Sequence, residues 1–123
     1  MQPLAQLRAQ CGDETTHVYE LGGTLPGTLL GNAKPVYISA NVGEPFAVWA
    51  SFNDTQLTAF SVTSPTLQSL CRVYTTGEGG GPAGIFEARA VGHFEIQTQT
   101  ASDGCIMCPA ILGFQAEVTA IKR

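Results

Sequence analysis

The chain has 123 residues, enough for one domain with a single hydrophobic core. Hydrophobic residues make up 44% of it, but only 13% of residues are charged, about half the share that is usual in soluble domains. With a net charge of −4 and lysine only at Lys34 and Lys122, the sequence offers no basic surface for nucleic acid or an anionic membrane. No apolar run approaches the roughly 20 residues that span a bilayer. We therefore expect neither nucleic-acid binding nor membrane insertion.

The first predicted element is a short helix over residues 3–10, ended by Cys11-Gly12. From there on, turn-forming residues separate short runs rich in β-branched and aromatic side chains, which is typical of strands. The predicted strands are THVYEL (16–21), PVYISA (35–40), PFAVWAS (45–51), AFSVTS (59–64), LQSLCRVY (67–74), GIFEARA (84–90), HFEIQTQT (93–100) and FQAEVTAI (114–121). Seven or eight short strands at this spacing predict an all-β sandwich or barrel.

Alternation of apolar and polar residues assigns the faces of these strands. Both faces of the run 45–51 are apolar, which favours a central strand. We expect Val91-Gly92 to join the strands 84–90 and 93–100 as a tight hairpin. In strand 84–90 the predicted inward set is Phe86, Ala88 and Ala90. The strongest core candidates are Val48, Phe86, Phe94, Ile96, Phe114 and Val118.

Residues 75–84, TTGEGGGPAG, form the most glycine-rich stretch of the chain. A phosphate-binding loop would contain a GK[ST] triplet and would be followed by a helix whose N-terminus meets the anion. In this sequence apolar and polar residues alternate with a period of two after the stretch, as in a strand, and the GK[ST] triplet is missing. We therefore interpret the stretch as a loop between two strands that either satisfies turn geometry or presents bare backbone to a partner.

The order of the pieces resembles the chagasin-type inhibitors of papain-family cysteine peptidases, over about residues 35–122. The matching stretches are ISANVGEPFAVWASFNDTQLTAFSV, TTGEGGGPAGIFEARAVGHFEIQTQT and FQAEVTAIK. The family places three loops at one end of a small immunoglobulin-like sandwich. In this sequence the first loop corresponds to Asn53, Asp54, Thr55, Gln56 and Leu57, and the second to Gly77, Glu78, Gly79, Gly80 and Gly81. Residues 102–112, with Ile106 and Met107, replace the third loop.

The resemblance implies an immunoglobulin-like antiparallel β-sandwich over residues 35–123. Residues 1–34 lie outside it, and we expect them to form an N-terminal extension with one added strand. The resemblance also implies a non-enzymatic binding module without cofactors, in its most specific form a peptidase inhibitor that binds through these loops. Asn53-Asp54-Thr55 additionally fits the N-glycosylation pattern, and a glycan there would block the first loop.

Four cysteines, Cys11, Cys71, Cys105 and Cys108, admit three disulfide pairings. The spacing of Cys105 and Cys108 is also that of a redox or zinc motif. A thioredoxin-like motif needs a following helix in a βαβ setting, and a zinc site normally needs a second close pair. We therefore favour two disulfides in an oxidising compartment, which places the protein outside the cell or on its surface. The pairing we prefer is Cys11–Cys71, with Cys105–Cys108 as a local clip of the third loop.

A second hypothesis makes the protein a structural subunit of an extracellular assembly or filament. Residues 12–34 hold one good strand and a tether rich in glycine and proline. Such a strand either completes its own sheet or pairs with the edge of another copy of the chain. His17 and His93 have no partners in the pattern that would make them catalytic, and we do not expect an enzyme.

The disulfide interpretation predicts that alkylation of the unreduced protein labels no thiol, because all four cysteines are oxidised. Mass spectrometry of the alkylated protein measures this directly. Four labelled cysteines, or zinc released on acidification, would contradict the two disulfides and favour the zinc or redox interpretation.

Overall fold

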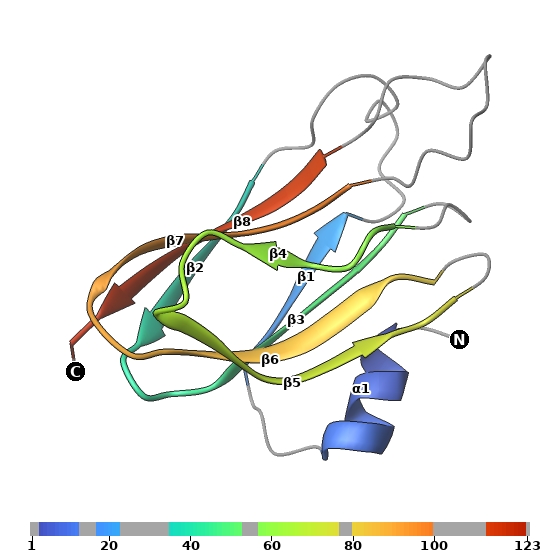
Figure 1. Ribbon diagram of the computed structural model, residues 1–123, viewed down its shortest axis with the longest axis horizontal. Helices are drawn as coiled ribbons and strands as arrows, with labels where there is room; N and C mark the ends of the chain where they lie inside the picture. The colour runs from blue at the N-terminus through green and yellow to red at the C-terminus, as the bar shows by residue number, and fades with distance from the viewer. Residues whose placement is uncertain are drawn as a thin grey trace.

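The structure, a computed structural model, describes residues 3–12, 17–22, 35–52, 57–76, 80–99 and 113–122. Within these residues the chain forms one helix and eight strands (Figure 1). The elements are α1 (Pro3–Cys11), β1 (Val18–Gly22), β2 (Val36–Asn41), β3 (Phe46–Ser51), β4 (Ser61–Val62), β5 (Leu67–Tyr74), β6 (Pro82–Ala88), β7 (Gly92–Gln99) and β8 (Gly113–Ile121). Each predicted strand overlaps an observed one.

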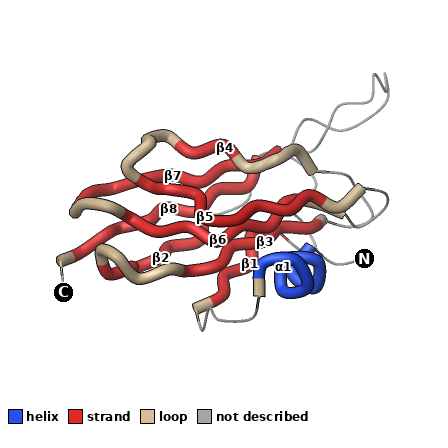
Figure 2. The backbone as a smooth tube through the Cα atoms, turned by 60° about the horizontal axis from the view of Figure 1, so that its bottom comes forward, coloured by secondary structure: helices blue, strands red, loops and turns tan. Residues whose placement is uncertain are grey.

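The strands form two four-stranded sheets that pack face to face (Figure 2). The first sheet has the order β1-β3-β6-β5, and the second has the order β2-β8-β7-β4. The predicted β-sandwich is thus confirmed. It differs from a wholly antiparallel sandwich at two edges, because β1 pairs in parallel with β3 and β2 pairs in parallel with β8. β3 lies between β1 and β6, as its two apolar faces predict.

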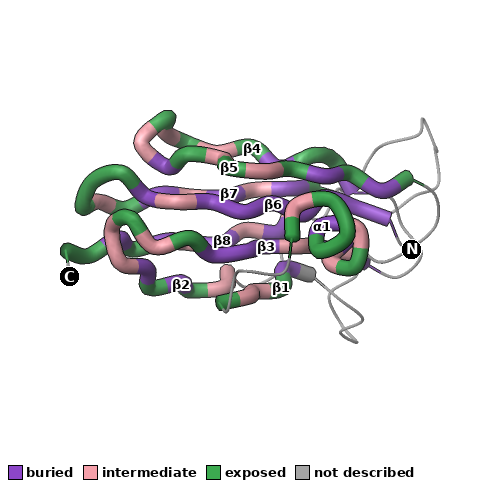
Figure 3. Tube along the Cα trace, turned by 90° about the horizontal axis from the view of Figure 1, so that it is seen from below, coloured by how far each residue is buried: buried purple, intermediate pink, exposed green. Residues whose placement is uncertain are grey.

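The core between the sheets is built by the alternating residues that the sequence assigns to it. Along β7 and β8 every second side chain is buried, and Figure 3 shows this alternation. The six predicted core residues are all buried: Val48, Phe86, Phe94, Ile96, Phe114 and Val118. Phe86 lies at the centre of an aromatic group, with the rings of Phe46 and Phe60 about 6 Å from it, at 6.2 and 6.1 Å between centroids.

The hairpin predicted at Val91-Gly92 is wrong. β6 belongs to the first sheet and β7 to the second, so residues 89–91 carry the chain across the sandwich. Ala90, expected to face the core, is exposed because it lies in this connection. Alternation could not reveal the difference, because a strand keeps the same inward residues whether the next strand lies beside it or opposite it.

The helix α1 covers the outer face of the first sheet. Its Leu7 is buried and packs in a second apolar cluster with Ala47, Val73, Ala83 and Ile85. The helix ends where Cys11-Gly12 predicts, because Gly12 adopts a φ of 87° and its N–H donates to the Arg8 carbonyl at 3.2 Å. Among the described residues, no helix is long and apolar enough to cross a membrane.

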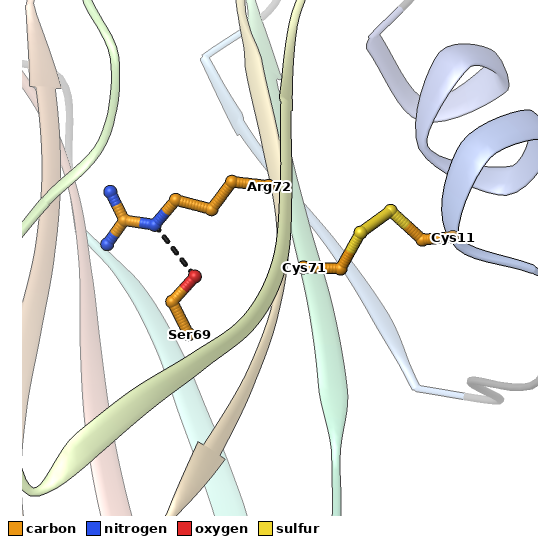
Figure 4. The surroundings of a disulfide bond; sticks show 4 residues. All are labelled: Cys11, Ser69, Cys71 and Arg72. Carbon is orange, nitrogen blue, oxygen red and sulfur yellow. Dashed lines mark hydrogen bonds between the residues drawn. A yellow bond between two sulfur atoms is a disulfide. The ribbon is translucent and has the colours of Figure 1, made fainter.

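A disulfide joins Cys11, the last residue of α1, to Cys71 on the edge strand β5 (Figure 4). The two Cα atoms are 6.3 Å apart and the bond spans 60 residues of sequence. The predicted Cys11–Cys71 pairing is thus confirmed, whereas Cys105 and Cys108 lie outside the described residues. The bond attaches the N-terminal helix to the sandwich, although the boundary at residue 34 stays a prediction.

The buried face of β7 predicts that Phe94→Ala lowers the free energy of unfolding by about 3–5 kcal/mol, the usual cost of truncating a buried phenylalanine. Denaturant unfolding followed by fluorescence measures the change. Tyr37→Ala is the matched control, because Tyr37 lies on the second sheet but is 73% exposed. A loss below about 1 kcal/mol for Phe94→Ala would contradict the assignment of the face.

Candidate functional site

The stems of the three predicted loops lie at one end of the sandwich. β6 runs antiparallel to both β3 and β5, so the end of β3, the end of β5 and the start of β6 meet there. In the second sheet Gln99, the last residue of β7, pairs with Gly113, the first residue of β8. The Thr58 N–H donates to the Gln99 carbonyl at 2.8 Å and brings the second sheet's stem beside the first loop's stem. We call this end, with its stems, the loop end (Figure 1).

Most of the predicted partner-binding residues lie outside the described part of the chain. These are Asn53, Asp54, Thr55, Gln56, Gly77, Glu78, Gly79, Ile106 and Met107. Leu57, Gly80 and Gly81 are described, and all three are buried. They therefore form stems that hold the loops and offer little surface to a partner.

Gly81 closes the glycine-rich loop against the first sheet. A Cβ atom at this position would lie 2.3 Å from the carbonyl oxygen of Ala50, so only glycine allows the two backbones to approach this closely. Gly81 also exchanges hydrogen bonds with Thr75: its N–H donates to Thr75 Oγ1 at 3.0 Å, and its carbonyl accepts from the Thr75 N–H at 3.0 Å. Gly81 therefore serves packing and the closure of the loop.

Residues 57–60, which we call the crossing segment, lead from the first loop toward β4 in the second sheet. Two side chains of β5 hold this segment by its backbone. The Tyr74 hydroxyl donates to the Leu57 carbonyl, and Arg72 Nη1 donates to the Phe60 carbonyl at 3.0 Å. The Arg72 guanidinium carbon also lies 5.5 Å from the centroid of the Phe86 ring, which places the arginine on the core side of β5.

On its other side the crossing segment is held by β7. The Gln99 N–H donates to Thr58 Oγ1 at 3.1 Å, beside the bond from the Thr58 N–H to the Gln99 carbonyl. Thr98 is buried, and its hydroxyl donates to the Thr58 carbonyl. The crossing segment is thus bonded both to the strand that enters the second loop and to the strand that enters the third.

A bulge in β5 makes this arrangement possible. Ser69 pairs with Phe86 and Cys71 with Ile85, so the residue between them, Leu70, has no partner in the ladder. Beyond the bulge, side chains switch faces: Figure 4 shows Cys71 directed toward α1, and Ser69 and Arg72 on the opposite side of the strand. Strict alternation would have placed the side chains of Ser69 and Cys71 on the same face of the sheet.

Sequence reasoning missed Arg72, Tyr74 and Thr58 because their side chains bond to backbone groups of segments that are distant in the sequence. One signal was present. Arg72 and Tyr74 are two residues apart at the end of a strand, next to the glycine-rich stretch, and such residues share a face.

The loop end also carries a groove of about 330 Å³ on the second sheet. Its lining consists of Pro35, Gln97, Thr98, Gln99, Gly113, Phe114 and Gln115. In this groove, polar side chains and the residue before β2 lie next to the stem of the third loop. Pro35, which directly precedes β2, therefore also lies at the loop end.

No protein-family model and no curated protein matches the sequence. Among solved structures, the chain is similar to the cysteine protease inhibitor EhICP2 from Entamoeba histolytica, with a TM-score of 0.51 and 6% sequence identity over 85% of this chain and 98% of that one. It is also similar to amebosin, with a TM-score of 0.41 and 13% identity over 81% of this chain and 98% of that one. The resemblance read from the sequence is therefore confirmed at the level of the fold, which is a chagasin-type, immunoglobulin-like sandwich.

Proposed function

We propose that the protein is a non-enzymatic binding module whose loop end enters the cleft of a papain-family cysteine peptidase. The observation that carries the proposal is the convergence of three loop stems at one end, bonded to one another through the crossing segment. EhICP2, a solved structure with a similar fold, is a cysteine protease inhibitor. Fold alone does not transfer function, and it is the loop end that supports this one.

A peptidase cleft is a groove with its nucleophile at the floor, and it admits a chain only where side chains are small. The stretch from Gly77 to Gly81 contains a single side chain, that of Glu78. Its closing glycine is fixed by Thr75 and by contact with Ala50. A loop whose ends are fixed before binding loses less conformational entropy in the complex, which favours affinity.

The loops depart from the family pattern at two places. The first loop keeps Asn53 and Thr55 but lacks the proline and the Gly-aromatic ending, and the third reads SDGCIMCPAIL in place of Arg-Pro-Trp. Because aromatic and arginine side chains supply much of the binding energy at interfaces, we expect inhibition of papain to be weak.

We also propose that the protein acts in an oxidising compartment, secreted or at the cell surface. The Cys11–Cys71 disulfide supports this proposal, because such bonds persist where thiols are not kept reduced. The alternative, a subunit of a filament, needs the N-terminal strand to pair with another copy. In this structure β1 pairs with β3 of its own sheet over five residues, from Val18 to Gly22, which favours the binding module.

The proposal predicts weak inhibition of papain that is competitive with a peptide substrate. Gly79→Trp should abolish it, because the indole keeps the backbone of the second loop out of the cleft. Ala90→Trp is the control, since Ala90 is exposed in the connection between β6 and β7, at the opposite end of the sandwich. Initial rates give the apparent inhibition constant, and the melting temperature of each variant checks its fold.

Absence of inhibition at the highest soluble concentration of the wild type would contradict the peptidase as partner, and equal inhibition by both variants would contradict the role of the loop.

Light scattering under non-reducing conditions separates the two hypotheses: a discrete monomer fits the binding module, and a growing polymer fits the filament subunit.

A further inference from the structure

We propose that Tyr74 and Thr58 are positioning residues that hold the stems of the three loops in one arrangement through the crossing segment. The inference rests on the proposed function, since it names what fixes the binding surface, and it also has a structural consequence that is independent of any peptidase.

The hydrogen bonds between Tyr74 and Leu57, between Thr75 and Gly81, and between Gln99 and Thr58 each lie next to one of the three loops. Leu57, whose carbonyl accepts from Tyr74, directly follows residues 53–56 of the first loop. Tyr74 directly precedes Thr75, which closes the second loop with Gly81. Gln99, which is bonded to Thr58 in both directions, is the last described residue before the third loop. A shift of residues 57–60 would therefore move all three stems.

Packing alone does not fix the crossing segment. Leu57 and Phe60 are buried in the core, whereas Thr58 and Ala59 between them are exposed. Burial is non-directional and resists removal of the two side chains from the core, but it restrains rotation and sliding of the backbone less. Hydrogen bonds are directional, so the Tyr74 and Thr58 hydroxyls, together with Arg72 and Thr98, define where the backbone of the crossing segment lies.

Both residues are partly or largely exposed, which separates this role from a contribution to the core. Tyr74 is 42% exposed, and phenylalanine keeps the ring without the hydroxyl. Thr58 is exposed, and valine keeps its shape without the hydroxyl. The variants Tyr74→Phe and Thr58→Val therefore remove the bonds while leaving the fold intact.

The chain offers matched controls on the second sheet. Tyr37→Phe removes a tyrosine hydroxyl from β2, where the ring is 73% exposed. Thr119→Val removes a hydroxyl that lies 3.1 Å from His93 Nδ1, a side-chain contact between β7 and β8 away from the loop end. Thr58→Ser restores the hydroxyl and serves as the rescue variant.

The first readout is amide hydrogen exchange of the free proteins. Tyr74→Phe should speed exchange at the Gln99 N–H, which donates to Thr58 Oγ1 from β7, and Thr58→Val should speed it at the Thr75 N–H, which closes the second loop. A local bond without coupling would leave these remote amides unchanged. Tyr37→Phe, Thr119→Val and Thr58→Ser should match the wild type at both amides.

The second readout is the apparent inhibition constant for papain, which should rise by roughly three- to tenfold in Tyr74→Phe and Thr58→Val, as expected for the loss of one hydrogen bond. Unchanged remote exchange overturns the inference, and so does altered exchange with unaltered inhibition. If the wild type does not inhibit papain, the proposed function fails, and the exchange results alone decide whether residues 57–60 couple the stems.

Discussion

Strand β5 contains one residue, Leu70, that has no partner on β6. This extra residue reverses the face of the sheet to which each following side chain points. Ser69 and Cys71 face consecutive partners, Phe86 and Ile85, and Leu70 is left 45% exposed between them. After this bulge Cys71 and Val73 face α1, whereas Arg72 and Tyr74 face the crossing segment. Without the shift, either the disulfide or the bonds to residues 57–60 would be lost.

The edge strand β5 is consequently held from both sides. From outside, the disulfide and the cluster around Leu7 attach it to α1, and from inside Arg72 and Tyr74 attach it to the crossing segment. An edge strand is otherwise the least restrained strand of a sheet, since it has one hydrogen-bonded neighbour. Fixing this one fixes the stem of the glycine-rich loop, and a fixed stem lowers the entropy cost of binding.

Much of the fold follows from local patterns. Alternation assigns the buried faces of β7 and β8, two apolar faces place β3 inside its sheet, and Cys11-Gly12 ends α1. The connection at Val91-Gly92 was wrong, because alternation is blind to which sheet the next strand joins. The role of Tyr74 and Thr58 could not be predicted either, because their partners are backbone atoms brought close only by the tertiary fold.

The central claim is that the loop end is the binding surface. The most direct test is to map amide chemical shifts of the isotope-labelled protein during titration with papain. We predict changes at Thr58, Thr75, Gly80 and Gln99, with α1 and the outer face of the second sheet unaffected. Changes confined to α1, or to the exposed edge of β2 around Tyr37, would contradict the account.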